Sequence, residues 1–311
     1  MTYVLFSLFF VFVQHSLFAK DYNIVDYGAI KDGKTLNTSQ IQSAIDAAFK
    51  DGGGRVIIPE GHFLSGSIIL RSGVEMHLNK DAVLLGSTDP KHYKKTYYWK
   101  ALILAQEQKN ISITGSGIID GQGRKLALHI DSLFYAGKID SSKYNFVEMR
   151  PKFYLRPLII DFVECRNIKV SGVIIKNSAC WVQSFDRCLD LDIDGIRVES
   201  DAYWNNDGID IVDSKNVRIT NSHINASDDG ICIKSHLKEY TSDSIYIANC
   251  VVRSSASAVK FGTKVLGTIK NVVIKNIKVY DTFRSAIAIE SVDGGKIENI
   301  SIDSLTATNT G

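Results

Sequence analysis

Several features are scarce in this chain of 311 residues, and each one excludes a class of protein. The excess of one sign of charge is small: the chain has 36 Lys and Arg residues and 34 Asp and Glu residues, which gives a formal net charge of +2. A strongly basic nucleic-acid-binding surface is therefore not expected. The five cysteines form no Cys-x-x-Cys pair, which favours buried free thiols over a metal site and leaves open a bridge between neighbouring turns of a secreted protein. We expect neither a metal nor another cofactor.

The first 19 residues contain no Lys, Arg, Asp or Glu, and most of them are apolar. This run is too short to cross a bilayer and ends near a small residue, Ala19, so it predicts a signal peptide and a secreted or periplasmic protein. The usual basic residue before the apolar run is missing, which leaves an uncleaved anchor or a wrongly assigned start as alternatives. No later stretch has 18 consecutive apolar residues, so no membrane contact is expected after cleavage.

From Asn110 onward one short pattern recurs: a polar residue followed by apolar residues at alternate positions. Copies begin at residues 167, 190, 216, 244, 271 and 299, which are 23, 26, 28, 27 and 28 residues apart. An alternation of period two predicts a strand in each copy, and helical spacing is lacking. Two or three short strands in every 22–28 residues predict a parallel β-helix, in which each turn stacks on the next. A β-sandwich is the alternative, but it does not explain such even spacing.

One helix is expected near the start of the chain. Asn37 and Thr38 can cap it, and Ile41, Ala44, Ile45 and Ala48 form an apolar stripe at helical spacing before three consecutive glycines. Such a helix would cover the open end of a sheet stack, where a bare edge invites aggregation. Residues 20–311 are therefore predicted to form a single all-β domain, a parallel β-helix with a short N-terminal capping helix.

An Asp-Gly pair followed by alternating apolar residues occurs twice in register. The two pairs, Asp207-Gly208 and Asp229-Gly230, are 22 residues apart, and Asp228 adds a third carboxylate. Most Asp-Gly pairs are solvated turns. Stacked turns, however, lie roughly 4.8 Å apart, so carboxylates at equivalent places would repel one another. A chain that keeps three of them together is predicted to use them, and Asp207, Asp228 and Asp229 are the candidate catalytic residues.

Two segments interrupt the repeat. Residues 89–99 and 121–154 are rich in aromatic and basic residues. Insertions in solenoids usually project from one face, often the face that binds ligands. Aromatic rings beside cations suit stacking on sugars and gripping of carboxylates, although ordinary solvated loops explain the composition equally well.

The sequence resembles the polygalacturonase family, glycoside hydrolase family 28, over most of residues 20–311. The most specific matches are Asn205-Asn206-Asp207-Gly208-Ile209-Asp210 and Ser227-Asp228-Asp229-Gly230-Ile231; Asn177-Ser178-Ala179-Cys180-Trp181 and the start of the domain also match. The resemblance implies a right-handed parallel β-helix and an inverting hydrolase whose catalytic carboxylates are Asp207, Asp228 and Asp229. It also implies a pectin-type or other acidic polysaccharide as the substrate and binding partner, with Asp228 as the general acid.

Departures from the family pattern concern the substrate. Ser257 stands where the family has a His, and Ala288 and Glu290 stand where it has an Arg and a Lys that hold the substrate carboxylate. These changes predict poor turnover of plain polygalacturonate. Lys260 is expected in one outward column with Asp210, Cys232 and Ala288, where it either returns a positive charge to the substrate site or balances Asp210 or Glu290. The predicted substrate-binding residues are Asn205, Asp210, Lys234, Ser257, Lys260, Glu290 and Trp181.

Two other functions stay open at this point. The chain could be a binding protein of the same fold whose catalysis has been lost, or a polysaccharide lyase, which would need a basic residue as its base and usually Ca²⁺. The three aspartates do not match the spacing of an EF-hand. Residues 308–311 fall within a turn without a capping segment, which predicts either a fragment or an end covered by another chain.

Overall fold

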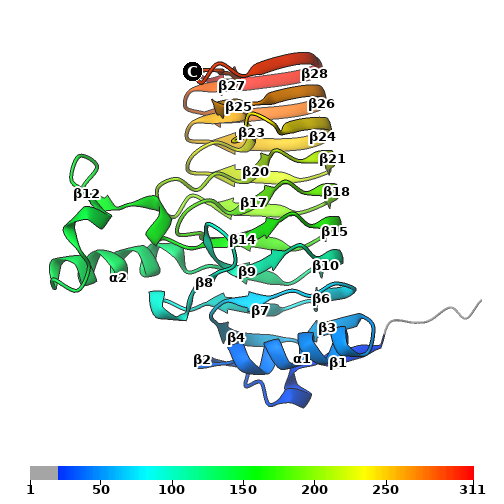
Figure 1. Cartoon of the computed structure of the whole chain (residues 1–311), viewed down its shortest axis with the longest axis vertical. Helices are drawn as coiled ribbons and strands as arrows, with labels where there is room; N and C mark the ends of the chain where they lie inside the picture. Colours follow the sequence, from blue (N-terminus) through cyan, green and yellow to red (C-terminus); the bar gives the residue numbers. More distant parts are fainter. Residues whose placement is uncertain (1–19) are drawn as a thin grey trace, which may run out of the picture.

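Two long parallel sheets form the walls of a right-handed parallel β-helix, as predicted (Figure 1). The computed structural model describes residues 20–311, and the predicted signal peptide at residues 1–19 lies outside the described residues. Within residues 20–311 no helix is long and apolar enough to cross a membrane.

Within the described chain the larger sheet has 17 strands and the second sheet has nine. The larger sheet contains β1 (Asp21–Asn23), β2 (Asp32–Leu36), β3 (Gly54–Ile58), β4 (Gly61–Ser65), β6 (Val74–Leu78), β7 (Ala82–Gly86), β10 (Lys109–Gly115), β11 (Ile118–Asp120), β15 (Arg166–Ser171), β16 (Ile174–Lys176), β18 (Leu189–Asp194), β19 (Arg197–Ser200), β21 (Lys215–Thr220), β22 (His223–Ala226), β24 (Thr241–Ser254), β26 (Thr268–Thr282) and β28 (Lys296–Thr310). The second sheet contains β5 (Ile68–Ile69), β8 (Lys94–Lys95), β9 (Lys100–Gln106), β14 (Leu158–Val163), β17 (Gln183–Asp186), β20 (Ile209–Val212), β23 (Ile231–Ser235), β25 (Ser257–Val265) and β27 (Ser285–Ile289).

In successive turns, the strand register places residues of the same chemical type on top of one another. One such column lies inside the solenoid and runs through Ile168, Leu191, Val217, Ile245 and Val272. All five side chains are buried in the core. The alternation of period two therefore places every second residue of a strand in this core, which is why the apolar pattern repeats with each turn.

The polar residue that opens each copy of the repeat has its own structural role. Asn167, Asp190, Asn216 and Asn271 all have φ between 52° and 59°, the left-handed region that Asn and Asp tolerate better than other non-glycine residues. Their side chains form ladders between turns. Asn216 Nδ2, for example, donates to Asp190 Oδ1 at 3.0 Å, and Asn167 Nδ2 donates to Asn110 Oδ1 at 2.7 Å. Each turn is thus fixed to the one before it at a corner of the solenoid.

Helix α1 (Thr38–Lys50) covers the N-terminal end of the stack and buries the predicted stripe of Ile41, Ala44, Ile45 and Ala48 (Figure 1). The predicted cap is wrong in its detail. Asn37 occupies the N-cap position but makes no capping hydrogen bond with its side chain. Its amide instead accepts from Ile30 N at 2.7 Å and donates to Ile30 O at 3.0 Å, because it is needed to hold the loop before the helix.

The insertion at residues 121–154 contains a helix that the sequence pattern did not predict. Helix α2 (Gly123–Tyr135) projects from the wall of the stack together with the hairpin of β12 (Tyr144–Asn145) and β13 (Arg150–Pro151) (Figure 1). Leu126, Ala127 and Ile130 bury one face of the helix. The insertions also contain short 3₁₀ turns, at Pro90–His92, Ser141–Lys143 and Phe153–Leu155, and another follows β1, at Ile24–Tyr27.

All five cysteines are buried and free, which confirms the prediction of buried thiols: Cys165, Cys180, Cys188, Cys232 and Cys250. No bridge between neighbouring turns forms among these residues.

Candidate active site

The three candidate carboxylates lie on two adjacent turns, just before strands β20 and β23, which pair in parallel with Ile209 opposite Ile231. The glycines between carboxylate and strand allow the turns to approach closely. A Cβ atom at Gly208 would lie 2.5 Å from Gly230 O, and one at Gly230 would lie 2.5 Å from Ala258 O. The repeated Asp-Gly pair therefore reflects tight stacking of the turns, which brings the carboxylates together.

The outward column predicted for Lys260 is present. Asp210 pairs with Cys232, Cys232 with Lys260, and Lys260 with Ala288. The neighbouring residues Ile209, Ile231 and Val259 face the core instead. In the other direction the column continues from Asp210 to Ser184 and Asp161.

Two buried lysines balance the charge of this column. Lys234 Nζ lies 3.0 Å from Asp207 Oδ2 and also forms an ion pair with Asp210. Lys260 Nζ lies 3.2 Å from Asp229 Oδ2 and 3.5 Å from Glu290 Oε2. Of the two carboxylates considered as partners of Lys260, Glu290 forms an ion pair with it. Asp210 does not, because it pairs with Lys234 instead.

Asp228 differs from its neighbours because no Lys or Arg among the described residues forms an ion pair with it. Its Oδ2 accepts a weak hydrogen bond from Asn205 Nδ2 at 3.4 Å. Burial raises the pKa of Asp228 to about 6, and the charges of Asp207 and Asp229 act in the same direction. Asp228 can therefore carry a proton in mildly acidic to neutral solution.

Burial also acts on the charges around Asp228. It raises the pKa of Asp207, although Lys234 opposes this effect. Burial works against the charge of Lys234 itself, but the carboxylates of Asp210 and Asp207 outweigh it and raise the pKa of Lys234 well above its ordinary value. Lys234 is thus a permanent cation within the site.

Asn205 is positioned by a buried arginine from an earlier turn. Arg156 Nη2 donates to Asn205 Oδ1 at 2.7 Å, and Arg156 Nη1 donates to the carbonyl oxygens of Trp204 and Ala179. The guanidinium also lies over the ring of Tyr203, 5.3 Å from its centroid. Arg156 therefore fixes the amide that faces Asp228.

A cavity of about 620 Å³ opens above the carboxylates. The two insertions supply aromatic rings to its wall, as their composition suggested. Trp99 packs against Phe153 and Trp181, with ring centroids 5.3 and 5.2 Å apart, and Lys234 Nζ lies 4.0 Å from the centroid of the Trp181 ring. Such a wall of rings suits the apolar faces of sugars.

Most of the residues predicted from the sequence line this cavity. Those that do are Asp207, Asp228, Asp229, Asn205, Lys234, Lys260 and Trp181. Asp210 lies beneath it, fully buried against Lys234, and Glu290 lies beside it, where its carboxylate accepts from Thr263 Oγ1 at 2.8 Å.

Ser257 does not line the cavity. Its side chain is buried and lies 3.2 Å from Ser285 Oγ on the next turn, while its backbone N–H donates to Asp229 Oδ1 at 3.0 Å. The side chain of Ser257 therefore contacts the next turn of its own column and does not face the cavity, and its predicted contact with substrate stays a prediction.

Seven residues of the cavity wall were missed by sequence reasoning: Asp186, Arg187, His236, Leu237, Gly262, Thr263 and Lys264. The first four lie at or just beyond the ends of strands β17 and β23, and the other three lie in the last part of β25. A comparison of equivalent strand ends, rather than of strand starts, would have singled them out.

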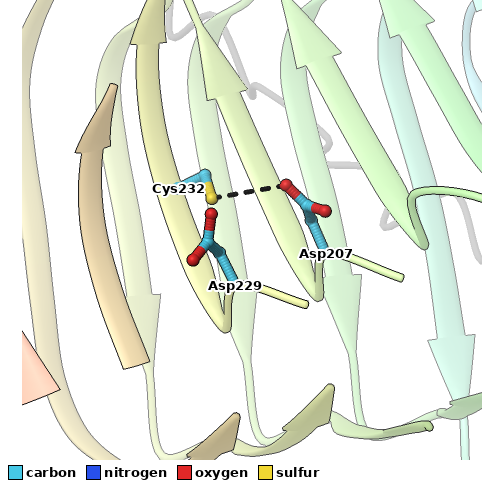
Figure 2. A group of neighbouring side chains, drawn as sticks. All are labelled: Asp207, Asp229 and Cys232. Atoms are coloured by element: carbon cyan, nitrogen blue, oxygen red, sulfur yellow. Dashed lines mark hydrogen bonds between the residues drawn. The ribbon is translucent and has the colours of Figure 1, made fainter. Parts of the chain in front are cut away.

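One group of side chains has the composition of a metal site. The ligand atoms of Asp207, Asp229 and Cys232 all lie within 4.8 Å of one another. Figure 2 shows these side chains, which come from neighbouring turns, with Cys232 Sγ 3.6 Å from Asp207 Oδ2. Lys234 and Lys260 already pair with the two carboxylates, and burial raises the pKa of the Cys232 thiol well above its usual value. This donor set is therefore already balanced by protein cations and does not fit a resident metal.

Comparison with known proteins places this geometry in context. Residues 52–310 match the sequence model of glycosyl hydrolases family 28. A probable polygalacturonase from Vitis vinifera is 26% identical over 307 residues, which cover 93% of this chain and 55% of that protein. An exopolygalacturonase from Zea mays is 31% identical over 216 residues, which cover 68% of this chain and 48% of that protein. The chain thus spans about half the length of the curated relatives it matches.

Among solved structures, the hyperthermoactive exopolygalacturonase from Thermotoga maritima superposes with a TM-score of 0.75 at 26% identity. The superposition covers 91% of this chain and 75% of the other.

Proposed function

Since the chain belongs to glycosyl hydrolase family 28, we propose that it is a secreted glycoside hydrolase that cleaves a pectin-type or other acidic polysaccharide with inversion of configuration. The observation that carries this proposal is the unequal charge environment of the three carboxylates. Asp207 and Asp229 each have a lysine within 3.2 Å, whereas Asp228 has none and has a pKa raised to about 6.

Inverting glycosidases need two carboxyl groups in opposite protonation states. One donates a proton to the leaving oxygen, and the other, roughly 6.5–9.5 Å away, activates a water molecule. Asp228 suits the first role because burial and like charges favour its neutral form. Asp207 and Asp229 suit the second, because each lies within ion-pairing distance of a buried lysine, Lys234 and Lys260 respectively.

The substrate is proposed to be anionic but different from plain polygalacturonate. The cavity combines aromatic rings with Lys234, Lys260, Arg187 and Lys264, which suits a sugar with negative groups. Glu290, however, stands where the family has a substrate-binding cation, and it takes part of the charge of Lys260. We therefore expect poor turnover of plain polygalacturonate and better turnover of a substituted or different acidic glycan.

Secretion is part of the proposal and rests on the charge-free apolar run at residues 1–19. Expression of the full chain in a bacterial or plant host should release a protein that begins near residue 20. N-terminal sequencing of the released protein checks this.

The catalytic assignment is tested by three substitutions. Asp207→Asn, Asp228→Asn and Asp229→Asn should each lower kcat by at least about 10²-fold without unfolding the protein, because each removes a group that moves a proton or orients water. Asp192→Asn, on the opposite wall and paired with Arg218, serves as the matched control. An Asp228→Asn variant with near-normal kcat would contradict the assignment.

Product analysis on a panel of pectic and other acidic oligosaccharides separates the alternatives. A hydrolase releases new reducing ends, and NMR immediately after cleavage should show the inverted anomer. A lyase would give unsaturated products that absorb in the ultraviolet, and a protein without catalysis would give neither. Rapid cleavage of plain polygalacturonate would refute the expected substrate preference.

A further inference from the structure

The cavity has a second cluster of polar side chains, away from the three catalytic candidates. Asp207, Asp228 and Asp229 precede strands β20 and β23, whereas Arg187 and His236 lie just beyond the ends of β17 and β23, and Lys264 is the second-to-last residue of β25. At roughly 3.3 Å per residue, the five residues of β23 alone separate the two ends by about 13 Å. The second cluster therefore lies along the strands from the three carboxylates, where it can meet a sugar unit next to the one that is cleaved.

The structure assigns to Arg187, His236 and Lys264 a second binding subsite, which takes an anionic group, a carboxylate or a sulfate ester, on a sugar unit beside the one being cleaved. The inference rests on the proposed hydrolase function and deepens it, because it names a recognition element for the substrate. None of the three residues belongs to the motifs by which the chain resembles its family.

Donor groups in this cluster are free to bind a ligand. Lys264 is exposed, and its ammonium forms no ion pair with any residue between 20 and 311. The imidazole of His236 makes no hydrogen bond to the described chain, while its backbone N–H donates to Asp213 Oδ2 at 3.0 Å and so fixes the residue in place. A free ammonium and a free imidazole thus face the same cavity.

Arg187 is held in a fixed position beside the same cavity, where it can bind an anion. Its Nε donates to Glu164 at 2.9 Å and its Nη1 donates to Asp186 at 2.9 Å, which leaves Nη2 without a partner among the described residues. The guanidinium also lies over the ring of Tyr97, 4.8 Å from its centroid. An arginine fixed on both sides loses little further freedom when it binds an anion, which favours affinity.

The electrostatic environment of His236 agrees with this geometry. Burial lowers the pKa of His236 to about 4, and Lys234, Lys264 and Arg187 act in the same direction, whereas Asp293 opposes them. The cluster also contains Asp186, whose pKa burial raises to about 6, and Asp213, whose pKa burial also raises, so burial opposes the charged form of both carboxyl groups. An anion bound beside the His236 imidazole would raise the pKa of this residue.

The test compares Lys264→Gln with Lys238→Gln, which removes the same charge from an exposed lysine just after His236 but outside the cavity wall. Binding is measured by calorimetry in the Asp228→Asn background, so that no substrate is consumed. Three probes are used: an oligogalacturonate, a sulfate-ester oligosaccharide, and the neutral oligosaccharide made by reducing the carboxylates of the first.

We expect Lys264→Gln to weaken binding of an anionic probe about tenfold, to leave the neutral probe unchanged, and to differ from Lys238→Gln, which should change nothing. The anionic probe whose binding Lys264→Gln weakens more shows whether the subsite binds a carboxylate or a sulfate ester. In the active protein, Lys264→Gln should raise KM with kcat held within about twofold. The anionic probe should also shift the His236 side-chain NMR titration upward, and His236→Gln identifies that signal.

The inference is overturned if no probe binds, if neither anionic probe is weakened by Lys264→Gln, if the neutral probe is weakened equally, or if the His236 titration does not move. The two proposals fail separately. Charge-selective binding without turnover of any glycan would sink the hydrolase function and keep the anion subsite. Turnover of a glycan without any charge-selective effect of Lys264→Gln would overturn the anion subsite and keep the hydrolase function.

Discussion

At the scale of single residues, the shared ion pairs of Lys260 predict how its loss affects catalysis. Its ammonium is shared between Asp229 and Glu290, so it is not free to grip the substrate alone. Lys260→Ala would leave two carboxylates without their cation, one of them a catalytic candidate. We therefore expect kcat to fall by about tenfold or more, with a smaller change in KM.

Steady-state kinetics of Lys260→Ala beside Lys270→Ala checks this expectation. Lys270 pairs with Asp243 on the other wall and serves as a control for the loss of a lysine. A large rise in KM with unchanged kcat would instead place Lys260 in direct contact with an anionic group of the substrate.

Asp161 is a buried carboxyl group without an ion-pair partner. It lies in the same outward column as Asp210, it is fully buried, and neither of its oxygens has a hydrogen-bond partner among residues 20–311. Burial raises the pKa of Asp161 to about 8, and the charge of Asp186 adds to this effect. The native protein therefore keeps this proton up to about pH 8, whereas the unfolded chain releases it near pH 4.

Stability should consequently depend on pH through Asp161. Because the folded state holds more protons between about pH 4 and pH 8, this group lowers the free energy of unfolding by about 1.4 kcal/mol for each pH unit of increase, and the effect levels off above pH 8. Asp161→Asn, which cannot ionise, should remove this slope and become relatively more stable as pH rises. Urea unfolding at pH 5, 7 and 9 measures it, and curves that run parallel with those of the wild type would contradict it.

At the scale of the structural elements, the asparagine ladder is open to a direct test. Asn216 combines a φ of 55° with a hydrogen bond to Asp190. Asn216→Ala loses both the hydrogen bond and a residue type that tolerates this φ, so we expect a loss of about 1–3 kcal/mol in unfolding free energy.

Asn216→Gly separates the two contributions, because glycine adopts the left-handed region without strain. It should be less destabilising than Asn216→Ala when both are measured by chemical denaturation. Equal losses would show that the ladder hydrogen bond, and not the backbone conformation, determines the choice of asparagine.

The elements also show where sequence reasoning succeeds. Strands and helix α1 were predicted because their apolar periods, two and 3.6, are local properties of the chain. Helix α2 was missed although Leu126, Ala127 and Ile130 form a helical face, because its surrounding aromatic and charged residues belong to no repeat. Its start depends on a distant contact: a Cβ at Gly123 would lie 2.0 Å from Ser178 O, a constraint that no local pattern reveals.

At the scale of the whole molecule, register explains which site residues could be predicted. Equal positions in successive turns lie side by side, so Asp207 and Asp229 could be brought together from spacing alone. The orientation of Ser257 could not, because it depends on how the chain bends into β25, where the backbone N–H and not the side chain faces Asp229. The cations near the strand ends were missed because the repeat pattern marks where the strands start and not where they end.

Backbone pairing continues without interruption beneath the longest insertion. Strand β9 pairs directly with β14, with Leu158 opposite Ala101, although more than 50 residues of chain separate these partners. Evolution can therefore lengthen, shorten or replace such a loop without disturbing the stack that supports it, because the supporting hydrogen bonds do not involve the loop. Related proteins can therefore acquire new substrates by exchanging a single inserted loop. Mutations in the stacked strands, in contrast, are limited by the need to keep the fold stable.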